Sequence, residues 1–204
     1  MIDLIDDIPA TARSVGIFGG TFDPIHTGHL LLAEYARDEM RLDIVLFLPA
    51  NIPPHKQDGR AISAAGCRLE MLRLATESNP GFAVSAHEIE CEGVSYTVDT
   101  LRRMRDAWPR AELTMLIGGD SARDFRSWRQ PERIAELARI GVWERPDIPL
   151  PAELLPGVGY HRINSPLIEI SSTEIRESVR DGRSIRYRLP DPVIQYINQH
   201  GLYR

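Results

Sequence analysis

Short apolar runs alternate with amphipathic stretches along most of the chain, and this alternation predicts the secondary structure. Apolar runs typical of strands lie at residues 14–18, 44–48, 82–85, 113–117 and 140–143. Stretches rich in helix-forming residues predict helices over residues 30–40, 67–77, 98–108, 131–138, 173–180 and 192–199. Alternating strands and helices are typical of α/β proteins, and continuous apolar strands fit a sheet covered on both sides. We therefore predict an α/β fold with a mostly parallel sheet and helices on both faces.

The pattern also indicates how the chain is divided. Two long connections, residues 49–65 and 145–166, are rich in proline and glycine and predict loops. No internal repeat, low-complexity tract or linker interrupts the rest of the sequence. We therefore expect one domain over residues 14–204, preceded by an N-terminal extension of residues 1–13 to which the sequence assigns no role.

Composition and charge exclude several classes of protein. The 204 residues are 43% hydrophobic and 26% charged, as in an ordinary globular protein, with a formal net charge of −5 that argues against a general nucleic-acid coat. Two cysteines are too few for a disulfide framework. No apolar run approaches the roughly 18 residues of a membrane span, and the acidic N-terminus is unlike a signal peptide. We expect a cytoplasmic protein that binds neither nucleic acid nor membrane.

One run of eleven residues points to phosphate chemistry. It reads Gly-Gly-Thr-Phe-Asp-Pro-Ile-His-Thr-Gly-His over residues 19–29 and lies between the first predicted strand and the first predicted helix. Open α/β sheets bind ligands at the carboxyl ends of their strands, and a helix N-terminus there offers N–H groups to a phosphate. His26 and His29 are three residues apart, so both imidazoles can face one ligand and donate to phosphoryl oxygens. Gly28 would leave room for a nucleotide between them.

The same run is also compatible with a site that holds no nucleotide. It could be a plain strand-to-helix turn with two surface histidines. The His-x-x-His spacing also fits a metal pair, but the sequence has no glutamate at the zincin position and no clear third ligand. The strand–turn–helix context of the whole run favours a nucleotide site.

A second motif, Ile-Ser-Ser-Thr-Glu-Ile-Arg, occupies residues 170–176. Ser171 and Glu174 have the spacing of a capping box, a common structural device at helix starts. Ser172, Thr173 and Arg176 add hydroxyl groups and a guanidinium at the same positive helix end. Together these groups could hold a polyphosphate.

The two motifs, in this order, resemble those of the nucleotidyltransferase superfamily, whose His-x-Gly-His motif also occurs in variant form in class I aminoacyl-tRNA synthetases. The form of the first motif is similar to that of bacterial nicotinate-nucleotide adenylyltransferases. The resemblance extends over most of the chain, from Val15 to Tyr203, and implies a Rossmann-like nucleotidyltransferase fold. It implies ATP binding by the first motif (Gly19, Gly20, Thr21, Phe22, His26 and His29), where we also expect Gly28 to lie against ATP, and, through its β- and γ-phosphates, by the second (Ser171, Ser172, Thr173 and Arg176).

Further segments resemble the acceptor side of that family. In the family, backbone N–H groups of a Tyr-Thr pair, here Tyr96 and Thr97, bind the nicotinate carboxylate, and an aromatic residue, here Trp128, stacks on the pyridine ring. Without the resemblance, Thr97 would be assigned as a helix cap and Trp128 as a core residue. Asp120 could accept hydrogen bonds from a ribose of ATP, or could simply cap the segment that follows it.

The proline-rich segment Pro-Pro-His-Lys, residues 53–56, resembles the family's loop near the phosphates. It implies that Lys56 binds ATP and that His55 binds the nicotinate nucleotide; by composition alone it is a solvated surface loop. Arg145 and Pro146 also match the family, but Asp147 stands where a glycine is usual, which leaves the role of Arg145 open.

The resemblance implies that the phosphate of nicotinate mononucleotide attacks the α-phosphorus of ATP and releases pyrophosphate. Because the attacking phosphate is already anionic, this reaction needs no general base; His26 and His29 would stabilise charge, and Arg176 would bind the leaving pyrophosphate. Mg²⁺ would be carried mainly by ATP rather than by protein ligands. Alternative acceptors are nicotinamide mononucleotide and pantetheine phosphate, and a non-catalytic adenylate-binding module would need the same motifs. Monomer and homodimer remain open.

Overall fold

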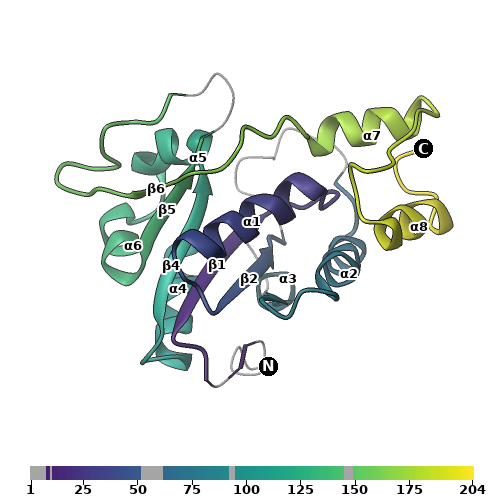
Figure 1. Ribbon diagram of the computed structural model, residues 1–204. Helices are drawn as coiled ribbons and strands as arrows, with labels where there is room; N and C mark the ends of the chain where they lie inside the picture. Colours follow the sequence, from purple (N-terminus) through teal and green to yellow (C-terminus); the bar gives the residue numbers. More distant parts are fainter. Residues whose placement is uncertain (1–7, 10, 52–61, 92–94, 145–148) are drawn as a thin grey trace.

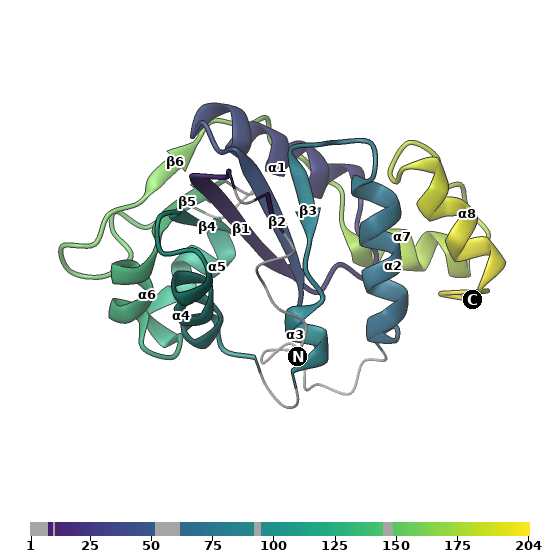
Figure 2. The ribbon, with the colours of Figure 1, turned by 90° about the horizontal axis from the view of Figure 1, so that it is seen from below.

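The computed structural model describes residues 8–9, 11–51, 62–91, 95–144 and 149–204, and contains a six-stranded, entirely parallel sheet. The strands are β1 (Ser14–Gly20), β2 (Ile44–Pro49), β3 (Phe82–Val84), β4 (Glu112–Gly118), β5 (Arg139–Trp143) and β6 (His161–Ile163). Their order across the sheet is β3-β2-β1-β4-β5-β6, which Figures 1 and 2 show together. This is the strand order of the doubly wound dinucleotide-binding fold, and it confirms the predicted Rossmann-like class.

The longer helices coincide with the amphipathic stretches of the sequence. They are α1 (Thr27–Glu39), α2 (Ala65–Thr76), α4 (Thr97–Ala107), α6 (Pro131–Leu137), α7 (Ser172–Arg180) and α8 (Asp191–Gln199). Shorter helices, α3 (His87–Glu90), α5 (Gly119–Asp124) and the 3-10 turn η2 (Phe125–Ser127), are not predicted by the pattern. Strand β6 also differs from the prediction, because it lies inside a segment predicted as loop. Its three residues include only one buried side chain, Ile163, so it shows no apolar run.

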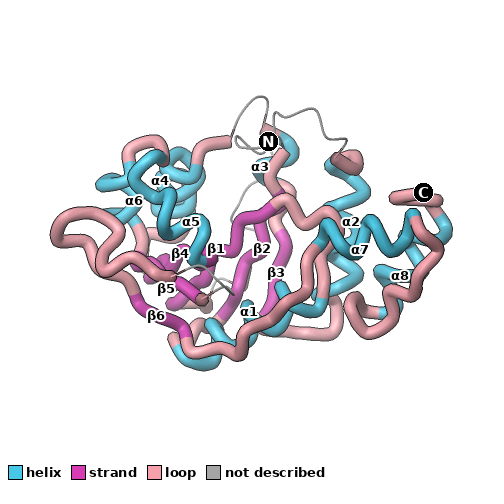
Figure 3. The backbone as a smooth tube through the Cα atoms, turned by 90° about the horizontal axis from the view of Figure 1, so that it is seen from above, coloured by secondary structure: helices cyan, strands magenta, loops and turns pink. Residues whose placement is uncertain are grey.

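Alternating side chains of the strands enter two separate cores, one on each face of the sheet. In β2, for example, Ile44, Leu46 and Leu48 enter the core covered by α4 and α6. Val45 and Phe47 enter the opposite core, which α1, α2, α7 and α8 complete. Both sides of the sheet carry helices in Figures 2 and 3, with α8 beside α2 at the β3 end of the molecule. The predicted burial of the strands on both faces is therefore confirmed.

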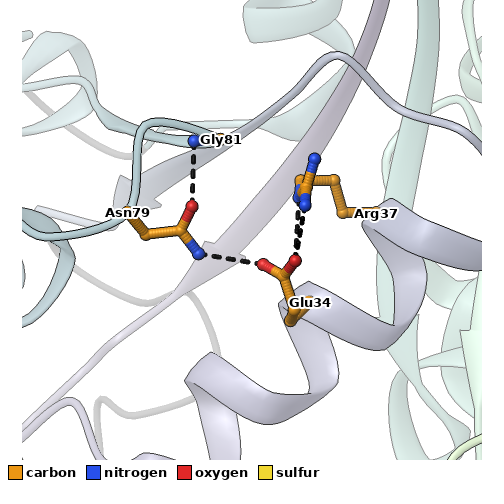
Figure 4. A network of polar contacts seen from close by, with 4 residues as sticks. All are labelled: Glu34, Arg37, Asn79 and Gly81. Carbon is orange, nitrogen blue, oxygen red and sulfur yellow. Dashed lines mark hydrogen bonds and ion pairs between the residues drawn. The ribbon is translucent and has the colours of Figure 1, made fainter.

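A polar network fixes α1 to the loop between α2 and β3 (Figure 4). The Arg37 guanidinium donates to the Glu34 carboxylate, whose second oxygen accepts from the Asn79 amide at 2.9 Å. The Asn79 side chain in turn accepts from the Gly81 backbone N–H at 2.9 Å. The hydrogen bond from Arg37 lowers the pKa of Glu34, so the carboxylate is the form that this network stabilises.

Candidate active site

A cleft of about 690 Å³ opens at the carboxyl ends of β1 and β4. These strands are neighbours, but the chain continues from β1 to β2 on one side and reaches β4 only later, on the other. The crevice at such a topological switch point is where open α/β sheets bind ligands. Of the residues singled out from the sequence, those that line the cleft are Gly19, Gly20, Thr21, Phe22, His26, His29, Tyr96, Thr97, Asp120, Trp128, Ser171, Ser172, Thr173 and Arg176. His55, Lys56 and Arg145 lie outside the described residues.

His26 and His29 form a reciprocal cap at the start of α1. Nδ1 of His26 accepts the backbone N–H of His29 at 3.3 Å, and Nδ1 of His29 accepts the backbone N–H of His26 at 3.2 Å. An Nδ1 that accepts a hydrogen bond carries no proton, so each neutral ring has its proton on Nε2. The rings stack with centroids 3.6 Å apart. The geometry therefore makes Nε2–H the donor that each ring offers, and a proton on either Nδ1 would break that cap.

The glycines of the first motif differ in what a side chain at each position would contact. A Cβ on Gly20 would lie 2.8 Å from the ring of Phe22, which is buried and has a positive φ of 49°. A Cβ on Gly19 would meet nothing within 4 Å, so the cleft there is open to a ligand. Gly28 does not line the cleft, and a Cβ there would lie 3.0 Å from His26 Nδ1 and 3.1 Å from Ile168. Its missing side chain makes room for the His26 ring.

The second motif touches the first directly. Ser171 is the N-cap of α7, and its hydroxyl accepts the Glu174 N–H at 3.1 Å, as the spacing predicts. The Ser172 hydroxyl donates to the Pro24 carbonyl at 2.9 Å. Arg176 donates to the Asp23 carbonyl at 2.7 Å and to the Thr173 hydroxyl at 3.2 Å. Two segments about 150 residues apart thus form one wall of the cleft.

Asp23 joins three distant parts of the chain, and the sequence gives no sign of this role. Its carboxylate accepts the Tyr203 hydroxyl at 2.7 Å and the Ser63 backbone N–H at 3.2 Å. Burial, with the negative charge of Asp23, raises the pKa of Tyr203, so its hydroxyl stays a donor. The C-terminal residues therefore support the first motif.

Arg68 is a second residue whose role the sequence does not indicate. The helix-forming stretch over residues 67–77 gives no sign that an arginine is buried there, and in the structure its neighbour Leu69 is only half-buried. Arg68 is 1% exposed. Its guanidinium donates to four backbone carbonyls, at 2.8 to 3.1 Å, which belong to Thr21, Ala50, Asn51 and Ser63. Arg68 thereby fixes the first motif to the end of β2.

The far end of the cleft is formed by α4 and the segment after η2. Tyr96 is the N-cap of α4, and its side chain does not cap the helix. Trp128 packs partly against the core while also lining the cleft, so a core position and a cleft position are compatible for this ring. Glu88 and Arg129 line the same end, although the sequence does not single them out. The Thr100 hydroxyl donates to Glu88 at 2.9 Å, and burial raises the pKa of the Glu88 carboxyl.

Within the described ranges, no group of three or more His, Cys, Asp or Glu side chains is arranged to hold a metal ion. None of the helices in these ranges has the length and apolarity needed to cross a membrane.

Comparison with known proteins assigns the chain to a family. Residues 17–178 match the model of the cytidylyltransferase-like family. A probable nicotinate-nucleotide adenylyltransferase from Thermomicrobium roseum is 46% identical over 200 residues, which cover 93% of this chain and 91% of the relative. A probable nicotinate-nucleotide adenylyltransferase from Desulfitobacterium hafniense is 41% identical over 208 residues, covering 97% and 99%.

Solved structures agree on the fold. The nicotinic acid mononucleotide adenylyltransferase of Plasmodium falciparum, complexed with NaAD, superposes with a TM-score of 0.78 at 20% identity, covering 94% of this chain and 97% of that one. The complex of the same enzyme with APC gives a TM-score of 0.77 at 19% identity. With the family match and the two bacterial relatives, the chain belongs to the nicotinate-nucleotide adenylyltransferases, within the cytidylyltransferase-like family.

Proposed function

We propose that this protein transfers the adenylyl group of ATP to nicotinate mononucleotide, giving deamido-NAD and pyrophosphate for NAD biosynthesis. One observation carries the proposal: Arg176 and Ser172 of the second phosphate motif bond directly to Asp23 and Pro24 of the first, so both motifs border one cleft. Family membership supports the same reaction.

In the proposed reaction, a phosphate oxygen of nicotinate mononucleotide attacks the α-phosphorus of ATP. The bond from that phosphorus to the oxygen bridging to the β-phosphate breaks, and pyrophosphate leaves. The Nε2–H groups of His26 and His29 donate to phosphoryl oxygens as charge develops, and Arg176 binds the leaving pyrophosphate. Because Nδ1 of each ring accepts a backbone N–H, Nε2–H is the group that each ring offers to a phosphoryl oxygen.

The remaining roles belong to the same proposal. ATP is bound along Gly19, Gly20, Thr21 and Phe22, and Asp120 accepts a hydrogen bond from its ribose. Ser171, Ser172 and Thr173 bind the phosphates, and Lys56 also contributes to ATP binding. The acceptor is bound by the backbone of Tyr96 and Thr97, by stacking on Trp128 and by His55. Mg²⁺ held by the ATP phosphates would neutralise their charge. We place the reaction in the cytoplasm.

The test is pyrophosphate release by purified protein with ATP, Mg²⁺ and either nicotinate or nicotinamide mononucleotide. We expect fast release with the acid and much slower release with the amide. His29→Ala should keep nucleotide affinity but lose transfer by roughly 10²-fold or more, because such donors act mainly on the transition state. His200→Ala, on exposed surface at the end of α8, is the matched control. Nucleotide binding without pyrophosphate release would instead indicate an adenylate-binding module. Pyrophosphate release only with pantetheine phosphate would identify that compound as the acceptor.

A further inference from the structure

A cation that the proposed reaction does not use lies at the acceptor end of the cleft. Arg129 follows Trp128 directly, and its side chain lines the cleft together with Tyr96 and Trp128. The Cζ atom of Arg129 lies 4.4 Å from the centroid of the Tyr96 ring. A guanidinium over an aromatic face is held by the ring, while its N–H groups stay in the guanidinium plane and point to its edges.

No short ion pair commits this guanidinium elsewhere in the described part of the chain. Its carboxylate partner is Asp99, at 3.7 Å, and Asp99 is closer to Arg102, at 3.2 Å. The Arg129 side chain is 51% exposed, so it can turn toward a ligand at little cost in buried contacts. Arg129 is thus positioned mainly by the face of the Tyr96 ring, and its ion pair with Asp99 is weak.

The surroundings of Arg129 favour an anionic group. The N-terminus of α4, an eleven-residue helix, lies at the same end and adds a partial positive charge. Two carboxyl groups oppose this: Asp99, in the first turn of α4 and 3.7 Å from Arg129, and Glu88, which lines the cleft. Burial raises the pKa of Glu88, which favours its neutral form. The acceptor end therefore combines a cation, a positive helix end and an aromatic surface.

We propose that the guanidinium of Arg129 sets the preference for an acceptor with a ring carboxylate over the corresponding carboxamide. A carboxylate accepts two parallel N–H bonds from a guanidinium. A carboxamide carries no charge and would place its own N–H donors against donors. This inference rests on the proposed function, since it concerns the acceptor of that reaction.

The experiment compares kcat/KM for nicotinate and nicotinamide mononucleotides in the wild type, Arg129→Gln and Arg129→Lys. We expect Arg129→Gln to lower kcat/KM for the acid about tenfold, through KM, while the value for the amide changes less than about twofold. Arg129→Lys should retain part of the preference because it keeps the charge but not the bidentate geometry. Arg123→Gln, a 59% exposed arginine outside the cleft, should leave both values unchanged.

Three other outcomes would contradict either the role of Arg129 or the proposed function. If the wild type prefers the acid and Arg129→Gln keeps the same ratio, the role of Arg129 is wrong while the proposed function stands. Equal losses for both acceptors would make Arg129 a general packing residue and would also overturn the inference. If the wild type adenylates neither mononucleotide, the proposed function fails, and the inference fails with it. Thermal unfolding of each variant shows whether it is folded. If Arg129→Gln is not, the acid-to-amide ratio of Arg129→Lys tests the role of Arg129 instead.

Discussion

His26 and His29 hold each other in place, because Nδ1 of each imidazole accepts the backbone N–H of the other residue, at 3.3 and 3.2 Å. The same bonds cap α1 and leave the proton of each ring on Nε2. Structure and chemistry therefore depend on different nitrogen atoms of one ring, and a substitution can separate them.

His26→Asn makes this separation. An asparagine side chain can accept the His29 N–H as an N-cap but has no Nε2–H in the cleft, so we expect stability within about 0.5 kcal/mol of wild type and a kcat lower by about 10²-fold. His26→Ala removes the cap as well and should lose about 1 kcal/mol or more. Urea denaturation and pyrophosphate release measure the two effects. An active His26→Asn would show that the Nε2–H of His26 is not used.

Gly19 and Gly20 are adjacent but should respond differently to alanine. Gly20→Ala places a methyl group 2.8 Å from the buried Phe22 ring and should cost about 1–3 kcal/mol of stability. Gly19→Ala meets no protein atom within 4 Å, so the free protein should keep its stability while KM for ATP rises. Thermal unfolding with and without ATP distinguishes the two. Equal unfolding temperatures for both variants would contradict the packing argument.

Arg68→Met removes the donor that serves four backbone carbonyls while keeping much of the apolar volume. Buried acceptors without partners cost about 1–3 kcal/mol each, so we expect a loss of at least about 3 kcal/mol. Arg73→Met, at a 57% exposed position of the same helix, should stay within about 0.5 kcal/mol. Urea denaturation of both variants checks this, and similar midpoints would mean that the carbonyls find new partners.

Glu88 should make the protein less stable as the pH rises. Burial raises its pKa above the ordinary value of a glutamate, about 4.3, so above that pH the folded state binds more protons than the unfolded state. Stability should therefore fall from about pH 4.3 upward until the folded-state carboxyl has ionised, and Glu88→Gln should remove that part of the fall. Glu90→Gln, an exposed position of the same short helix, is the control. Parallel pH profiles for wild type and Glu88→Gln, measured by urea denaturation, would refute the effect.

The sequence by itself determined the features that depend on neighbouring residues. Continuous apolar runs identified β1, β2 and β4, because a strand buried on both faces is apolar along its length and can be recognised without knowing its neighbours. The two phosphate motifs were also visible, since a strand–turn–helix segment and a capped helix start are local structures. Only the three-dimensional arrangement could show that these motifs meet at Asp23 and Pro24.

The tertiary structure decided what depends on residues far apart in the chain. Nothing near Tyr203 in the sequence indicates that its hydroxyl reaches Asp23, 180 residues away. Arg68 has the local pattern of a surface residue and is buried because four carbonyls from three other segments surround it. Strand β6 forms because β5 offers it a pairing edge, although its own three residues have little strand character. Burial and hydrogen bonding are properties of the assembled chain, so periodicity along the sequence could predict the elements but not these contacts.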